Sequence, residues 1–126
     1  MTRINVVPVE ELCDQHLLAE WRELPRMRAY AEKTSAKASE IPLRYTLGEG
    51  HMKFFLDKGV FLEQRHAKLT EELLRRGFNL MNTNRFEMSA KYGKKAYVPD
   101  LESLSINRAR ILERTPAKPR WSNTNG

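Results

Sequence analysis

Residues 48–76 constrain the fold of this chain more than any other segment. Leu62, Leu69 and Leu73 recur there at steps of seven and four, which places them on one face of a helix. Gly77 follows this segment directly, and glycine readily adopts the left-handed backbone that ends many helices. The segment therefore predicts one long helix whose apolar face packs against other elements.

Two further segments show helical spacing. Residues 8–33 carry an apolar stripe, and Pro25 lies inside it. Because proline lacks the N–H that would bond the Trp21 carbonyl, we expect this helix to kink there. Residues 100–114 predict a third helix with Asp100 as its N-cap. The residues expected on its core-facing side are Leu101, Leu104, Ile111 and Leu112.

The length of 126 residues and the hydrophobic content of 40% fit one compact domain with one core. No alternating strand pattern extends beyond short runs at residues 4–9 and 41–47. Residues 79–95 have no period and are expected to be irregular. We therefore expect an all-α single domain over residues 1–126. It has three main helices, the first kinked at Pro25, and an extended basic C-terminal tail.

The chain is strongly basic, with 22 Lys and Arg against 16 Asp and Glu and a net charge of +6. A small domain of this charge indicates a polyanionic partner, with nucleic acid first and an anionic membrane surface second. Cys13 is the only cysteine, which excludes an intramolecular disulfide and, with scattered histidines, predicts no metal site. No apolar run is long enough for a membrane helix or a signal peptide. We therefore expect a cytoplasmic protein associated with the nucleoid or with DNA.

The polar face of the first predicted helix carries a distinctive set of side chains. Gln15, Arg22 and Arg26 are spaced by seven and four, and His16 and Glu23 form a parallel row one position over. Arginines on both sides of a carboxylate can grip phosphate groups. The alternatives are an ordinary solvated face and an intrahelical salt bridge from Glu23 to one of these arginines.

Several blocks of the sequence match an enzyme family in residue type and spacing. They are residues 1–5 (Met-Thr-Arg-Ile-Asn), 14–17 (Asp-Gln-His-Leu), 20–26 (Glu-Trp-Arg-Glu-Leu-Pro-Arg), 47–51 (Leu-Gly-Glu-Gly-His), 54–58 (Phe-Phe-Leu-Asp-Lys) and 76–79 (Arg-Gly-Phe-Asn). With these blocks the chain resembles the phage pyrimidine dimer DNA glycosylases of the endonuclease V type. The resemblance implies an all-α enzyme that removes the 5′ base of a cyclobutane pyrimidine dimer and then cleaves the strand as an AP lyase. It also implies that no metal and no cofactor takes part.

The resemblance further implies two catalytic residues. The nucleophile is expected to be the α-amino group of Thr2 after removal of Met1, and such amines have a pKa of about 7.7–8 against about 10.4 for lysine. The neutral amine attacks C1′, the base leaves, and an imine joins Thr2 to the opened sugar. Glu23 is expected to stabilise the cationic sugar and to accept the C2′ proton, which leads to β-elimination.

DNA contacts are expected on the same side of the molecule as these two residues. The expected DNA-binding residues are Arg3, Gln15, His16, Arg22, Arg26, Arg110, Arg114 and Trp121. The expected partner is double-stranded DNA with pyrimidine dimers or abasic sites, bound by a monomer. The phage members carry a C-terminal cluster of aromatic residues with lysine, whereas this tail holds Trp121 alone, which puts strong dimer recognition in doubt.

Two alternative functions stay open at the level of the sequence. An AP lyase, or a glycosylase for another damaged base, would keep the chemistry with weak activity on dimers. A non-catalytic helical DNA-binding protein would use the basic face for phosphates alone. The carboxylate of Glu23 between arginines argues against the second alternative, because it weakens phosphate binding.

Overall fold

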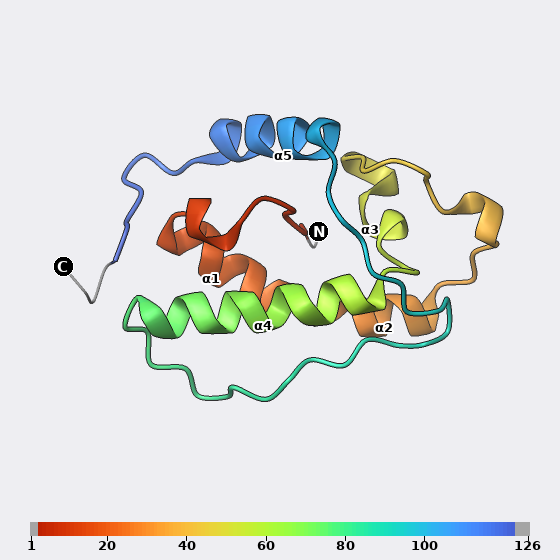
Figure 1. Ribbon diagram of the computed structural model, residues 1–126, viewed down its shortest axis with the longest axis horizontal. Helices are drawn as coiled ribbons and strands as arrows, with labels where there is room; N and C mark the ends of the chain where they lie inside the picture. The colour runs from red at the N-terminus through yellow and green to blue at the C-terminus, as the bar shows by residue number, and fades with distance from the viewer. Residues whose placement is uncertain (1–2, 123–126) are drawn as a thin grey trace.

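The computed structural model describes residues 3–122, which form helices joined by loops (Figure 1). The α-helices are α1 (Asp14–Glu23), α2 (Arg26–Lys33), α3 (His51–Phe54), α4 (Gly59–Arg75) and α5 (Leu101–Arg114). The short 3-10 helices are η1 (Val9–Glu11), η2 (Ala38–Glu40) and η3 (Gly48–Gly50). Residues 3–122 contain no β-strand beyond one isolated bridge, so the expected all-α class is confirmed. None of the helices in this range combines the length and the apolar character needed to cross a membrane.

The long helix α4 packs against α1 at the centre of the fold. Leu62, Leu69 and Leu73 are fully buried and belong to one cluster of buried apolar side chains. Beyond the helix, Gly77 adopts a φ of 93°, and the N–H of Phe78 donates to the Leu73 carbonyl over 3.0 Å. The predicted apolar face and C-terminal end of this helix are confirmed.

The start of α4 differs from the sequence prediction, because residues 48–57 form η3, α3 and a turn instead of one continuous helix. Phe54, Phe55 and Leu56 are consecutive, and all three are buried. Successive side chains of a helix point about 100° apart, so three successive buried side chains do not fit a helix with a single core-facing side. The N–H of Lys58 donates to the Phe55 carbonyl over 3.0 Å and closes this turn.

The predicted kink at Pro25 is a complete break, which divides the N-terminal helical region into α1 and α2. The N–H of Met27 donates to the Leu24 carbonyl over 3.0 Å, and the N–H of Arg28 donates to the Pro25 carbonyl over 3.3 Å. These three-residue bonds replace the helical bonds that proline interrupts. The region also becomes α-helical later than predicted, since residues 8–13 form η1 and a short extended link.

Residues 4–7 run through the interior, between α1, α4 and α5 (Figure 1). On the inner side of α5 lies Asn107, which has no exposed surface, whereas Leu101 and Leu112 are 84% and 78% exposed. The prediction that these two leucines face the core is therefore wrong. Buried backbone N–H groups need acceptors, so Asn107 takes a buried position on this side of α5. Leu104 and Ile111 are partly buried and pack against the core, as predicted.

Residues 115–122 leave α5 and return along the start of α1 without regular secondary structure. The N–H of Asp14 donates to the Arg120 carbonyl over 2.8 Å. The tail is therefore extended, as predicted, and it lies against the first helix.

Candidate active site

A pocket of about 250 Å³ lies between the N-terminal segment, α1 and the end of α5. Its lining residues are Arg3, Asn5, His16, Ala19, Glu20, Glu23, Ile111 and Arg114. Four of these, Arg3, His16, Glu23 and Arg114, are among the predicted site residues, and they come from three separate parts of the chain. The predicted nucleophile, Thr2, lies outside the described residues.

Buried side chains hold the N-terminal segment beside this pocket. The N–H of Ile4 donates to Nε2 of His51 over 2.8 Å. Asn107 Oδ1 accepts the N–H groups of Val6 and Val7 at 2.7 and 3.1 Å. No sequence prediction included these anchors, because each joins residues far apart in the chain and leaves no local pattern. Together they fix the point at which the chain enters the pocket.

A buried ion pair supports one wall of the pocket. Arg65 Nε and Nη2 donate to the Glu20 carboxylate at 2.8 and 3.0 Å, and the two side chains are 5% and 1% exposed. Glu20 Oε1 also accepts from Asn5 Nδ2 at 2.9 Å. The sequence predictions missed this pair, although Arg65 lies three residues after Leu62 and four before Leu69, on the apolar face of α4. A charge at such a position indicates a buried partner of opposite sign.

Positive charge surrounds the carboxylate of Glu23. The pKa of Arg3 is held below its usual value, first by burial and then by the neighbouring charges of Arg114 and Arg110. The Glu23 carboxylate acts in the opposite direction on the pKa of Arg3, and both side chains line the pocket. Three guanidinium groups therefore create a potential that attracts anionic groups to this pocket.

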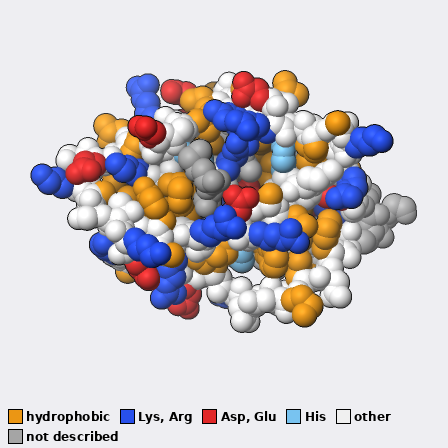
Figure 2. Space-filling model, turned by 180° about the vertical axis from the view of Figure 1, so that it is seen from behind, with side chains coloured by type: hydrophobic (Ala, Val, Ile, Leu, Met, Phe, Trp, Pro, Cys, Tyr) orange, Lys and Arg blue, Asp and Glu red, His pale blue; other side chains and the backbone are white. Residues whose placement is uncertain are grey.

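Glu23 is partly buried, and within residues 3–122 its carboxylate forms no ion pair or hydrogen bond. The alternative salt bridge to Arg22 or Arg26 is therefore not formed in the described structure. Arg22 and Arg26 are exposed and lie outside the lining of the pocket, while Arg110 is partly buried and contacts Glu113 at 3.4 Å. Figure 2 shows basic side chains gathered around an acidic one near the centre of this face.

Gln15 and His16 hold the C-terminal tail in the structure. Gln15 Nε2 donates to the Lys118 carbonyl over 2.9 Å, and its Oε1 accepts the N–H of Arg120 over 3.0 Å. His16 Nε2 lies 2.9 Å from the Arg114 carbonyl. DNA contacts by these two residues stay a prediction. Their observed role is to fix the chain that follows α5.

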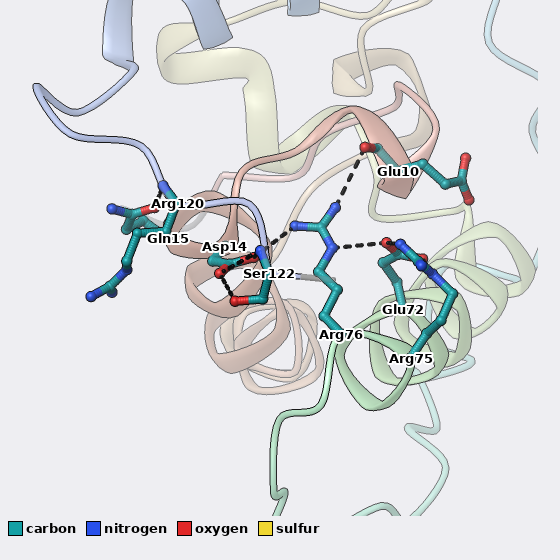
Figure 3. A network of polar contacts seen from close by, with 8 residues as sticks. All are labelled: Glu10, Asp14, Gln15, Glu72, Arg75, Arg76, Arg120 and Ser122. Atoms are coloured by element: carbon teal, nitrogen blue, oxygen red, sulfur yellow. Dashed lines mark hydrogen bonds and ion pairs between the residues drawn. The ribbon is translucent and has the colours of Figure 1, made fainter. Parts of the chain in front are cut away.

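An ion-pair network fastens the tail to the start of α1 (Figure 3). Arg76 Nη1 donates to Asp14 Oδ1 over 3.0 Å, and its Nε donates to Glu72 Oε2 over 2.8 Å. Asp14 also accepts from the N–H and the hydroxyl of Ser122. The Arg76 guanidinium lies 5.6 Å from the centre of the Trp121 ring. The network thereby holds a largely exposed indole at the surface.

We expect the protein to lose stability in two steps as the pH falls. Burial lowers the pKa of His51 and of His66. In the unfolded chain such rings protonate near pH ~6.5, before the folded ones, so the free energy of unfolding should fall as the pH drops below that value. Although burial opposes the shift, hydrogen bonds from Ser122 and Arg76 lower the pKa of Asp14, so a second loss follows below about pH 4.

Urea denaturation over a series of pH values measures both steps. His51→Gln removes one of the two rings and should diminish the first step without changing the second. A free energy of unfolding that stays constant from about pH 7 to about pH 5 would contradict the prediction.

The described residues contain no group of three or more His, Cys, Asp or Glu side chains that could hold a metal ion. The pocket lining includes the Glu23 carboxylate, the His16 imidazole and the guanidinium groups of Arg3 and Arg114.

Comparison with known proteins assigns the chain to a family. A sequence model of the family described as pyrimidine dimer DNA glycosylase matches residues 1–86 of the chain. The matched part includes the pocket residues Arg3, Asn5, Glu20 and Glu23 and the whole of α4, whereas α5 lies beyond it. Because the match covers well over half of the 126 residues, the chain belongs to the pyrimidine dimer DNA glycosylase family.

Proposed function

We propose that this protein removes a base at pyrimidine dimers in duplex DNA and then cleaves the strand as an AP lyase. The α-amino group of Thr2 is the nucleophile, and the Glu23 carboxylate is the acid–base group. The observation that carries the proposal is the position of Glu23. Its carboxylate forms no ion pair or hydrogen bond within residues 3–122, and it lies in the pocket that Arg3, the first described residue, and Arg114 also line.

The first step uses the amine. Residue 2 is one peptide unit from Arg3, and consecutive Cα atoms are about 3.8 Å apart, so the amine is tethered beside the pocket that Arg3 lines. Neighbouring guanidinium groups favour the neutral form of an amine, which carries the attacking lone pair. The nitrogen bonds to C1′ of the damaged nucleotide and the bond from C1′ to the base breaks. The base takes up the proton that the attacking amine releases and stays joined to the neighbouring base through the cyclobutane ring.

The second step breaks the strand. The nitrogen loses its proton, the bond between C1′ and the ring oxygen opens, and an imine joins Thr2 to C1′. The imine acidifies the C2′ proton, and Glu23 removes it. The electron pair left at C2′ forms a double bond to C3′ and expels the 3′ phosphate oxygen. Water then hydrolyses the imine and frees the amine.

The proposal extends to the basic residues around the pocket. Arg3 and Arg114 line it and can contact the phosphates next to the lesion. Arg22 and Arg26 are exposed on neighbouring positions of α1 and α2, where they can contact the flanking backbone. Trp121 is 56% exposed and offers a face on which a base can stack.

Borohydride trapping on a duplex with one abasic site tests the proposed nucleophile. We expect a covalent protein–DNA adduct that maps to the N-terminal peptide with Thr2, because reduction converts the imine into a stable amine. An intact duplex of the same sequence serves as the control and should give no adduct. An adduct on a lysine, or no adduct at all, would overturn the terminal-amine mechanism.

A second candidate function is an AP lyase that prefers abasic sites over dimers. The observation that favours it is the tail, in which Trp121 is the only aromatic residue after α5. The ratio of single-turnover rates on irradiated and abasic duplexes decides between the two functions. A rate on dimers far below the rate on abasic sites supports the second.

A further inference from the structure

Two buried side chains hold both polar groups of a single residue next to the pocket. His51 Nε2 accepts the N–H of Ile4 over 2.8 Å, and the Tyr45 hydroxyl donates to the Ile4 carbonyl over 3.3 Å. The rings of His51 and Tyr45 also contact each other edge to face, with their centres 5.6 Å apart. His51 is 2% exposed and Tyr45 is 3% exposed, so water does not compete for these bonds.

The contacts of His51 define the state of its ring. A backbone N–H can only donate, so Nε2 must carry a lone pair and the ring must be neutral. The proton is then on Nδ1, which lies 2.9 Å from the Thr46 carbonyl and donates to it. Both ring nitrogens are used, and the Thr46 bond fixes the orientation in which the other nitrogen meets Ile4.

The bond to Ile4 is placed where it restricts the amino end most strongly. Arg3 lines the pocket and directly precedes Ile4. Two residues span at most about 7 Å, so an anchor at the Ile4 N–H limits the volume that the amine of residue 2 can reach. The Asn107 bonds to Val6 and Val7 lie further along the chain and restrict the amine less.

We propose that His51 is a positioning residue that holds the amino end of the chain at reacting distance from C1′. The proposal rests on the function proposed above, with the amine of Thr2 as nucleophile. His51 touches no substrate atom in this role and acts through the backbone of Ile4. The expected consequence of losing the bond is a slower chemical step with unchanged DNA affinity, because the arginines that bind phosphate stay in place.

Two substitutions each remove one of the two hydrogen bonds of the His51 ring and keep the other. His51→Asn places an amide nitrogen near the position of Nδ1 and keeps the bond to the Thr46 carbonyl, but it has no acceptor that reaches Ile4. His51→Gln places its amide oxygen near the position of Nε2 and keeps the acceptor for Ile4, but it loses the bond to Thr46. Each variant loses one buried hydrogen bond, so we expect the two to have similar thermal stability.

The measured quantity is the single-turnover rate of borohydride trapping on a duplex with one abasic site. We expect His51→Asn to be about 100-fold slower than the wild type and His51→Gln to be within about fivefold of it. Affinity for a duplex with a reduced, uncleavable abasic site should change by less than about twofold in both variants. Tyr45→Phe deletes one hydroxyl and keeps the ring packing, and it should be about tenfold slower even if His51→Asn does not fold.

The possible outcomes test the positioning role of His51 separately from the proposed mechanism with the Thr2 amine. Equal losses in the Asn and Gln variants would overturn the role of His51 and indicate that its packing matters instead. Trapping at the wild-type rate in His51→Asn, or in Tyr45→Phe where His51→Asn is unfolded, would also overturn it. A wild-type protein that forms no adduct would overturn the amine mechanism itself, whatever the variants do.

Discussion

Replacement of Glu23 by glutamine should slow cleavage of the glycosidic bond in dimer-containing duplexes by about 100- to 10,000-fold. The amide keeps the size of the side chain and most of its hydrogen-bonding capacity, but it cannot stabilise a cationic sugar or take up the C2′ proton. DNA affinity should be kept or improved, because a negative charge leaves a pocket lined by arginines. We therefore expect Glu23→Gln to slow the reaction of the enzyme–DNA complex without weakening DNA binding.

Single-turnover kinetics with excess enzyme measure cleavage of the glycosidic bond, and a gel-shift titration measures affinity. Glu32→Gln is the matched control, since Glu32 is an exposed glutamate on α2 that pairs with Arg28 and lies outside the pocket. It should leave both quantities close to those of the wild type. A Glu23→Gln variant that loses binding and turnover in equal measure would show that this carboxylate has a structural role.

Replacement of Arg65 by methionine should destabilise the fold by about 3–5 kcal/mol. The Glu20 carboxylate would remain buried without its bidentate partner, and the Val7 carbonyl would lose a donor. A protein of this size typically has a free energy of unfolding of about 5–15 kcal/mol, so the variant should be largely unfolded at moderately raised temperature. Urea denaturation followed by circular dichroism measures the loss.

A double variant separates the buried charge from the lost packing. In Glu20→Gln/Arg65→Met the buried group is a neutral amide, which can still accept from Asn5, so part of the stability should return. Lys68→Met is the control on the same helix, since Lys68 is exposed on α4. If Arg65→Met is no less stable than Lys68→Met, the ion pair does not support the pocket wall.

Features encoded by neighbouring residues were predictable from the sequence. Asp100 caps α5 by accepting the N–H of Ser103 over 2.7 Å, and Gly77 ends α4 with left-handed backbone. The break at Pro25 likewise follows from one residue and its missing N–H. Such signals act over three or four positions, so they can be read without knowledge of the fold.

Features that depend on long-range contacts were not predictable in the same way. The inner face of α5 includes the buried polar side chain of Asn107, which accepts the N–H of Val6, and these two residues are 101 positions apart. Apolar spacing alone therefore assigned Leu101 and Leu112 to the core, where the structure has neither. In the same way, no pattern in the sequence around His51 indicates a bond to Ile4.

The candidate site shows the same difference between features that are encoded locally and features that depend on long-range contacts. The sequence predicted four site residues that the structure brings together in one pocket: Arg3, His16, Glu23 and Arg114. The ion pair of Arg65 with Glu20 was not predicted, because the apolar spacing of α4 was interpreted without regard to the charge of Arg65. A charged side chain in an otherwise apolar helical face is thus a signal in its own right, and here it indicates a buried partner of opposite charge, Glu20.

The path of residues 4–7 between the helices has a consequence for synthesis of the protein. These residues leave the ribosome early, whereas α5, which supplies their acceptor at Asn107, is made about a hundred residues later. Until then the N–H groups of Val6 and Val7 stay bonded to water, and closing so long a loop is slow. Until α5 is made, the pocket therefore lacks the wall that Ile111 and Arg114 form.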